Sequence, residues 1–342
     1  DNSFIKTKPI FTLSPRLGIA FSPIEEMTLF TNYSSYSQVP QYDLLYMSMD
    51  YLREWYKQQY SNVILNNPQL HPEKATRYEL GGLLQLKGIA SLNMTAYYKE
   101  ITDLIQMELI RSDYNKTTYS VLKNGDYAAV SGLDFTFDLK RWNNFAASVN
   151  YTLSGETGTS SDLNTLGPII WLSAQFPRFE ISPLDYIQRH TLAVNLDYRF
   201  SKVDNPILDQ LGLNLIFRAN RNITYAVNFS NTLSNHNNWN KRFDLKIDKT
   251  FELHYGIKLN AYLICLNLFN SVEIVSVWSE TGKPDDSGYL TSDEGKANIF
   301  RIINKYGPDA VNVYSALYNM HDMDPANVGA PRQMRLGVIV EF

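Results

Sequence analysis

Apolar and polar side chains alternate along several long stretches of the chain. In the final segment, one parity is wholly apolar and consists of Met334, Leu336, Val338, Val340 and Phe342. Residues 189–200 repeat the pattern, with mostly aliphatic and aromatic side chains on one parity and polar ones on the other. Because successive side chains of a β-strand point to opposite faces, a period of two over about ten residues predicts strands and excludes helices.

The same alternation recurs through the chain with different strength. Clear strands are expected at residues 91–99, 133–140, 145–153 and 243–248, and weaker ones at residues 17–21, 28–35, 77–86, 211–220 and 257–268. The pattern predicts an all-β, antiparallel protein of about eleven strands.

Strand length favours a membrane barrel over a soluble β-sandwich or propeller, in which alternation looks the same. Strands of soluble proteins centre on about 5–6 residues, whereas the longest ones here extend over about 10–13. Ten residues at about 3.3 Å each, tilted by about 40°, climb roughly 25 Å, which is the height of the apolar band of a transmembrane β-barrel.

The connections between the expected strands alternate between short and long. Short links are expected at residues 22–27, 87–88, 141–144, 201–210 and 253–256, and long ones at residues 37–75, 111–118, 155–187, 221–241 and 271–332. An outer-membrane barrel has tight turns on its periplasmic rim and long loops outside, so this rhythm indicates two rims that face different compartments.

Composition excludes several other classes of protein. The 31 basic and 35 acidic side chains give a net charge of −4, which argues against a polycation that binds nucleic acid. The single cysteine, Cys265, excludes a disulfide within these residues and a multi-cysteine zinc site. Its parity places it on the apolar face as a small hydrophobic side chain. The uneven number of strands predicts that further strands are needed to close the sheet.

Several motifs, in order, resemble the C-terminal barrel of TonB-dependent outer-membrane receptors, most closely those with a carboxypeptidase-regulatory-like domain at their N-terminus (Oar-like receptors). These motifs are Ser14 to Phe21, Gln38-Val39-Pro40, Asn67 to Glu73, Tyr78 to Gly81, Tyr97-Tyr98-Lys99, Gly132-Leu133-Asp134, Arg189-His190, Asp244 to Lys249, Asn267-Leu268-Phe269-Asn270 and Pro331-Arg332-Gln333 with Phe342. Asp134 stands where the family usually has Glu.

This resemblance implies that residues 1–342 are the second half of a barrel of about twenty-two strands around an N-terminal plug. The plug, the TonB-contacting segment and a signal peptide would lie upstream of Asp1. The expected location is the outer membrane, with Phe342 as the barrel-assembly signal. The implied partners are outer-membrane lipid and lipopolysaccharide, the protein's own plug, the TonB complex and, in some relatives, a lipoprotein lid; nucleic acid is not among them.

Two groups of residues are candidates for functional roles. Polar residues on strand faces are expected to line the lumen and face the plug: Asp197, Arg199, Asp244, Lys246, Asp248, Arg335 and Glu341. Aromatic residues of the exterior loops could stack on a ligand, or form the girdle of aromatic side chains at the membrane interface: Trp171, Phe176, Trp239, Trp278 and Tyr289.

The segment Tyr42–Tyr60 predicts a helix with one apolar face inside the first long loop. This helix would either cover the pore or dock a partner, or else form a small satellite core with neighbouring loops.

No catalytic residues, metal site or cofactor are predicted. The five histidines do not share a strand face, and no local Ser–His–acid arrangement is present. The expected function is TonB-dependent import of a nutrient ligand of the siderophore, glycan, peptide or vitamin class. A passive outer-membrane channel and a structural barrel subunit of a larger envelope assembly remain alternatives.

Overall fold

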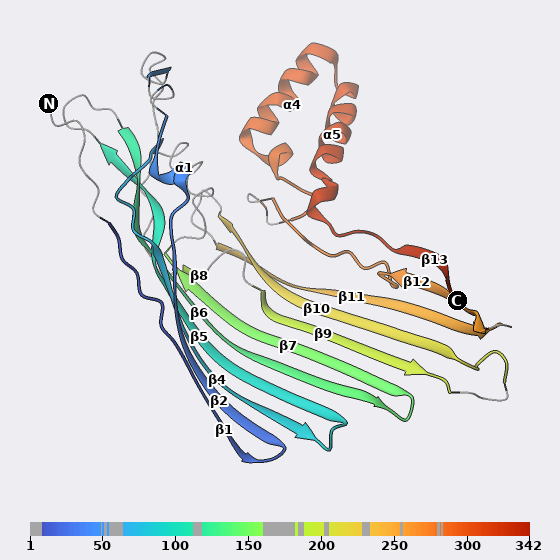
Figure 1. Ribbon diagram of the computed structural model, residues 1–342. Coiled ribbons are helices and arrows are strands. Elements are labelled where there is room, and N and C mark those ends of the chain that lie inside the picture. The colour runs from blue at the N-terminus through green and yellow to red at the C-terminus, as the bar shows by residue number, and fades with distance from the viewer. Residues whose placement is uncertain are drawn as a thin grey trace. The chain divides into compact units, whose positions relative to one another are not determined.

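The computed structural model describes residues 9–48, 50, 53–54, 64–111, 118–159, 182–183, 188–201, 205–227, 233–253, 256–278, 281 and 283–342. Its strands form one sheet, in the hydrogen-bonded order β1-β2-β4-β5-β6-β7-β9-β10-β11-β12-β13 (Figure 1). The eleven strands on this path confirm the predicted all-β class and strand number. Two short strands lie off the path, where β3 pairs with β6 and β8 pairs with β7.

The strands have the following bounds: β1 (Arg16–Ile24), β2 (Met27–Gln38), β3 (Ile64–Leu65), β4 (Glu73–Leu86), β5 (Ala90–Arg111), β6 (Thr118–Trp142), β7 (Phe145–Gly158), β8 (Ser182–Pro183), β9 (Gln188–Arg199), β10 (Leu211–Val227), β11 (Leu233–Glu252), β12 (Lys258–Leu266) and β13 (Gln333–Glu341). The helices are α1 (Tyr42–Leu45), η2 (Tyr289–Thr291), α4 (Asp293–Tyr306), α5 (Asp309–Asp322) and η3 (Pro325–Asn327).

Three parts of the structure differ from the sequence analysis. Strands β5 and β6 are 22 and 25 residues long, whereas strands of 9 and 8 residues were expected at residues 91–99 and 133–140. Strands β10 and β11 extend into residues 221–241, where a long loop was expected. The segment 271–332, for which only a long connection was expected, contains two helices of 14 residues each, α4 and α5.

Residues with left-handed backbone conformations form two of the predicted tight turns. Lys87 and Gly88 have φ values of 47° and 69°, and Asn143 and Asn144 have values of 46° and 74°. Two consecutive residues with positive φ form the hairpin turn whose twist matches that of the flanking strands, and Gly and Asn adopt this conformation most readily. These turns fix the register of the strands that follow them.

The chain divides into two compact units. The first comprises residues 1–84, 93–133 and 154–184, and the second comprises residues 85–92, 134–153 and 185–342.

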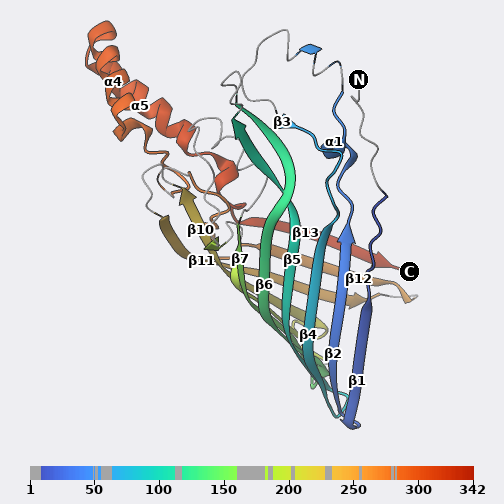
Figure 2. The same cartoon turned by 90° about the vertical axis from the view of Figure 1, so that its left-hand side faces the viewer.

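In the first unit, β1, β2 and β4 lie side by side (Figure 2). Leu17, Ile19 and Phe21 of β1 share one face with Leu80 of β4, and all four side chains are exposed. In a soluble sandwich this face would be buried against a second sheet.

The first unit also has a small apolar core outside this exposed face. Leu70, Ile105 and Leu122 are buried together, and Leu44 and Leu45 of α1 pack against them. Helix α1 covers only the first turn of the helix predicted at Tyr42–Tyr60: the backbone is extended at Tyr46 and residues 46–48 are not helical, while residues 49, 51–52 and 55–60 lie outside the described residues. Its contacts correspond to the satellite core considered above.

The second unit repeats the two-faced pattern. Val194 of β9, Phe217 of β10 and Phe243 of β11 are neighbours in the register, and the two phenylalanine rings stack at 4.5 Å. On β13 the apolar parity is uncovered, and Leu336 is 83% exposed. Cys265 has the apolar parity, and it is buried between its register neighbours Leu245 and Met334.

Helices α4 and α5 of the second unit lie side by side (Figure 1 and Figure 2). Ser292 caps the N-terminus of α4 by accepting a hydrogen bond from the backbone of Gly295 at 3.0 Å, and Gly307 ends the helix with a φ of 87°. Within the described part of the chain, every helix is too short or too polar to cross a bilayer.

Candidate functional site

The seven residues predicted to line a lumen share one face of the second unit's sheet. Register joins Asp197 to Asn214 and Lys246, and it joins Arg199 to Gly212 and Asp248. Lys246 is the register partner of Ile264, which in turn is the partner of Arg335. Lys258 has the same parity as Ile264, and it is the register partner of Glu341. Asp244 has the same parity as Lys246 and Asp248. The alternation of strand side chains therefore gathers all seven on the polar face.

A first charge cluster on this face joins side chains of three strands, β6, β9 and β11. Arg141 of β6 and Arg199 of β9 both pair with Asp197, and Arg199 also reaches Asp248 of β11, with Nη1 to Oδ2 at 3.3 Å. Lys246 lies 3.7 Å from the other oxygen of Asp248. Asp248 is 2% exposed, so its charge depends on these partners.

Gly212 makes the first cluster sterically feasible. It is the register partner of both Arg199 and Asp248 on the intervening strand β10. A Cβ at this position would lie 2.9 Å from Oδ1 of Asp248. The missing side chain leaves the space in which the arginine and the carboxylate meet.

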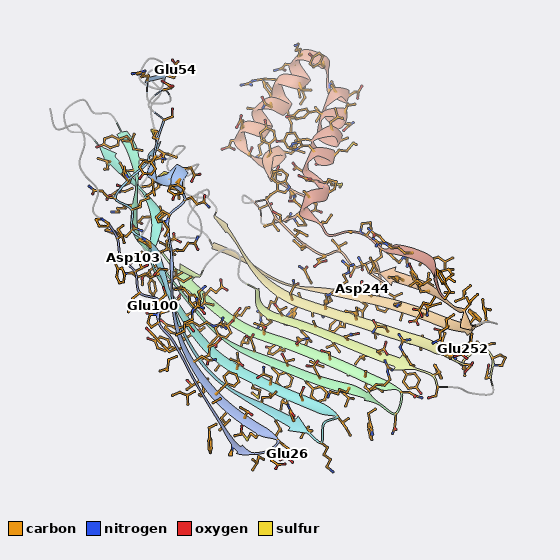
Figure 3. All side chains as sticks on the ribbon, viewed as in Figure 1. Glu26, Glu54, Glu100, Asp103, Asp244 and Glu252 are labelled. Carbon is orange, nitrogen blue, oxygen red and sulfur yellow. The ribbon has the colours of Figure 1, made fainter. Side chains whose placement is uncertain are left out.

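A second cluster surrounds Asp244, which Figure 3 labels on β11. The carboxylate accepts hydrogen bonds from Nη1 of Arg218 at 3.0 Å, from Nε of Arg242 at 2.9 Å and from the backbone N–H of Asn267 at 2.8 Å. Asp244 is 5% exposed. Arg218 and Arg242 are not among the residues predicted to line the lumen, although both have the parity of the polar face.

Asn267 and Asn270 explain why the Asn-Leu-Phe-Asn motif stands at the end of β12. Both residues have positive φ, 54° and 51°. The side-chain amide of Asn267 donates to the carbonyls of Ser271 and Ala330, and Asn270 accepts from the backbone N–H of Arg332. The motif therefore joins the beginning and the end of the long segment between β12 and β13.

Arg335 and Glu341 lie on β13, away from the two clusters. Arg335 donates to the side-chain oxygen of Gln333 on its own strand at 3.2 Å. The final residue, Phe342, continues the apolar parity of β13 and is fully exposed.

The aromatic candidates occupy different environments. Trp171 and Phe176 lie outside the described residues. Trp239 lies in β11 rather than in a loop, and it has the parity of the apolar face. Its ring stacks on His190 at 5.6 Å, and His190 is hydrogen-bonded to the hydroxyl of Tyr151 at 2.8 Å. Such a row across neighbouring strands is typical of an aromatic girdle at a membrane interface, the alternative considered for these residues.

Trp278 and Tyr289 belong to the ordered segment around α4 and α5. Nε1 of Trp278 donates to the carbonyl of Asp322 at 3.1 Å, and the ring of Tyr289 stacks on Tyr318 at 4.5 Å. Burial, followed by the nearby charge of Asp322, raises the pKa of the Tyr318 hydroxyl above its ordinary value. Both candidates are half-buried and help to hold this segment together.

The carboxylate of Asp322 organises the same segment. It is 3% exposed, and one oxygen accepts from the backbone N–H of Ser287 at 3.0 Å and from the Ser287 hydroxyl at 2.8 Å.

Within the described parts of the chain, no group of three or more acidic, histidine or cysteine side chains is arranged to hold a metal ion.

Comparison with known families decides what this two-faced sheet is. The profile described as "TonB dependent receptor-like, beta-barrel" matches residues 2–268. The chain belongs to the family of TonB-dependent receptor β-barrels. Members of this family are receptors and transporters of the outer membrane.

Solved receptors share the fold of this TonB-dependent receptor barrel. The outer membrane transporter YddB from Escherichia coli aligns with a TM-score of 0.51 and 14% identity, over 74% of this chain and 36% of YddB. A mutant ferric enterobactin receptor, PfeA, from Pseudomonas aeruginosa in complex with enterobactin aligns with a TM-score of 0.51 and 18% identity, over 76% of this chain and 35% of PfeA. The chain thus spans about a third of the length of these receptors. Comparison with curated proteins finds none that matches the chain.

Proposed function

We propose that this chain forms part of the wall and exterior segments of a barrel that imports a nutrient ligand across the outer membrane with energy delivered through TonB. One observation carries the proposal. Strands long enough to cross a membrane present an uncovered apolar face on one side and paired charges on the other. Charged clusters of this kind suit a wall that contacts protein or water inside a tube.

The proposal includes further strands and a plug domain beyond these residues. The chain corresponds to about a third of each solved receptor it matches, which supports a larger barrel. In such a barrel, Asp197, Arg199, Asp244, Lys246, Asp248, Arg335 and Glu341 would face the plug. A TonB-contacting segment, a signal peptide and the plug would belong to the N-terminal part, and Phe342 would serve in barrel assembly.

The ligand class in this proposal is a siderophore, glycan, peptide or vitamin. Structures with a similar fold include a receptor in complex with enterobactin. This supports a scarce nutrient as the ligand in general and does not favour one particular ligand. Trp278 and Tyr289 would contribute indirectly, by shaping the exterior segment that contains α4 and α5. The chemistry is binding and gating, without a bond made or broken. Lipopolysaccharide contacts the apolar face, and a lipoprotein lid is a candidate partner for the exterior side.

An uptake experiment tests this proposal. A strain that lacks the gene and the same strain with the gene restored are grown in the same medium. The compounds that remain in the medium are compared by mass spectrometry. The depleted compound is then offered to cells that lack TonB or are treated with a protonophore. Active import predicts that uptake is lost in the deletion strain and in both energy-deficient conditions.

Two outcomes would contradict the proposal. A passive channel would keep its uptake without TonB, and the purified protein would conduct ions in a planar bilayer. A structural subunit would leave the medium unchanged while the deletion altered the integrity of the envelope.

A further inference from the structure

A hollow in the polar face of the second unit has a charge arrangement that the pairings above leave incomplete. Its volume is about 160 Å³, and it lies where β9, β10 and β11 pair. Side chains of the polar parity line most of it: Thr191, Ala193, Arg218, Asn220, Asn240 and Arg242. The hollow therefore belongs to the polar face and not to the apolar one.

Two like charges lie next to each other in the lining of this hollow. Arg218 of β10 and Arg242 of β11 are direct register partners. Like charges in this position destabilise a pair of strands unless an opposite charge bridges them. Asp244 is that bridge, since Arg218 binds its Oδ2 and Arg242 binds its Oδ1. Oδ1 also accepts the backbone N–H of Asn267. Two guanidinium groups thus share one carboxylate.

The arginines retain hydrogen-bonding capacity after this pairing. A guanidinium group has five N–H donors in a planar fork. Toward the described residues, Arg218 and Arg242 each use one nitrogen, on Asp244. The side chain of Arg218 is 56% exposed. Donors therefore remain for an acceptor that enters the hollow.

The other charged residue of the lining is Glu273. Its side chain lies against Gly329, where a Cβ would come within 3.0 Å of Oε2. Among the described residues, neither arginine lies within ion-pairing distance of Glu273. The hollow thus has an excess positive charge beside Asp244 and a negative charge elsewhere in its lining.

We propose that this hollow binds a carboxylate group, which the free N–H donors of Arg218 and Arg242 hold. A planar carboxylate matches the fork of a guanidinium, and two such forks are available. The volume admits a carboxylate with a few attached carbon atoms. The inference rests on the proposed function in taking this face as the inside of the barrel. The carboxylate then comes either from the imported ligand or from an acidic side chain of the plug.

Chemical modification of arginine tests the site in the unaltered receptor. The full protein, purified from outer membranes in detergent, is treated with phenylglyoxal, and peptide mass spectrometry gives the modification rate of each arginine. Sodium succinate is the probe, and sodium chloride at equal ionic strength is its control. We expect succinate to slow modification of Arg218 and Arg242 at least threefold, and to leave the rate of Arg335 on the same face unchanged.

Variants test how the charges of the lining affect the binding of succinate. In Arg218→Gln, succinate should no longer protect Arg242. In Glu273→Gln, the succinate concentration that gives half-protection should fall about threefold, because a nearby negative charge no longer repels the anion. Arg335→Gln is the matched control, and it should change neither value.

A second arm identifies a carboxylate supplied by the plug. In that case Arg218 and Arg242 are modified slowly without succinate, and in Arg218→Lys a water-soluble carbodiimide links the new amine directly to an acidic side chain of the plug. Either protection or this cross-link supports the site.

The proposal is overturned if succinate gives no protection and no cross-link forms, whatever the basal reactivity of the arginines. Modification and cross-linking do not depend on transport. A failed uptake experiment and a failed binding site are therefore distinguishable.

Discussion

Replacing Val194 by arginine tests whether the apolar face contacts lipid. Val194 lies on the apolar parity of β9, with Val149 and Phe217 as its register neighbours. His190, which stacks on Trp239, marks one end of the apolar run, and Tyr198, which packs edge-on against Phe200 at 4.9 Å, marks the other.

The position of Val194 sets the size of the effect. It is equidistant from His190 and Tyr198 along the strand. Four residues at about 3.3 Å each, with a tilt of about 40°, place it roughly 10 Å from each aromatic level along the membrane normal. An arginine that faces lipid near the bilayer midplane costs about 2–4 kcal/mol of folding free energy. Asn195→Arg, on the adjacent residue of the polar face, should cost less than about 1 kcal/mol.

The assay is a urea titration of the full receptor folded into phosphatidylcholine vesicles. The folded fraction is measured by its faster migration on a gel without heating. We expect Val194→Arg to lower the free energy of unfolding by the amount above and Asn195→Arg to remain close to the parent. Equal losses in the two variants, or a larger loss in Asn195→Arg, would refute the assignment of the lipid face.

Three further changes have defined outcomes. Asp244→Asn should lower the free energy of unfolding by about 3 kcal/mol in the same titration, because two cations and a backbone N–H lose a buried carboxylate. Gly212→Ala should cost about 1–2 kcal/mol, since its methyl group displaces the Asp248 carboxylate. Hydrogen bonds from Lys283 and the backbone of Gly288 lower the pKa of Asp286, so their stabilising effect is present above the ordinary value of 3.8 and is lost as pH falls through the lowered pKa. At a pH below this lowered pKa, the backbone amides of the turn at residues 283–288 should exchange faster relative to neighbouring residues, after correction for intrinsic rates.

Each of these predictions has a control. Asp138 lies on the same polar face and accepts a hydrogen bond from the hydroxyl of Ser148 at 2.7 Å, and no arginine of the described residues pairs with it. Asp138→Asn should cost well under half of what Asp244→Asn costs, and equal costs would remove the special role of the Asp244 cluster. Gly155→Ala tests general intolerance of alanine in a strand, because a Cβ there would meet only Oγ of Ser131, at an ordinary contact distance of 3.9 Å. The Asp286→Asn variant should show no pH-dependent change in exchange at the turn.

Strand parity made much of the polar face predictable from sequence. Asp244, Lys246 and Asp248 alternate with Phe243, Leu245 and Ile247, so their common face follows from the backbone alone. Their partners do not follow in the same way, since the pairing of Arg199 with Asp248 depends on the register of three strands and on the absence of a side chain at Gly212.

The missed elements have physical explanations. Residues 221–241 are rich in asparagine, which has low β-propensity, but the hairpin register continues through them and supplies backbone hydrogen bonds. Helices α4 and α5 did have signals in the sequence. Ser292 stands three residues before Gly295 with acidic residues between them, and Gly307-Pro308 separates the two helices.

The length of β5 and β6 has a consequence for how the sequence of this protein can change during evolution. A strand of 22 residues tilted by about 40° rises roughly 55 Å, about twice the apolar band. The same strand thus continues past the apolar band into water, with a positive φ of 60° at Asp103 along the way. Ile105 and Leu122, in the far halves of the two strands, are buried in the small core, whereas substitutions at the exposed positions there leave the apolar band unchanged. One continuous hairpin can therefore vary quickly at its far end while its base stays constrained by the lipid.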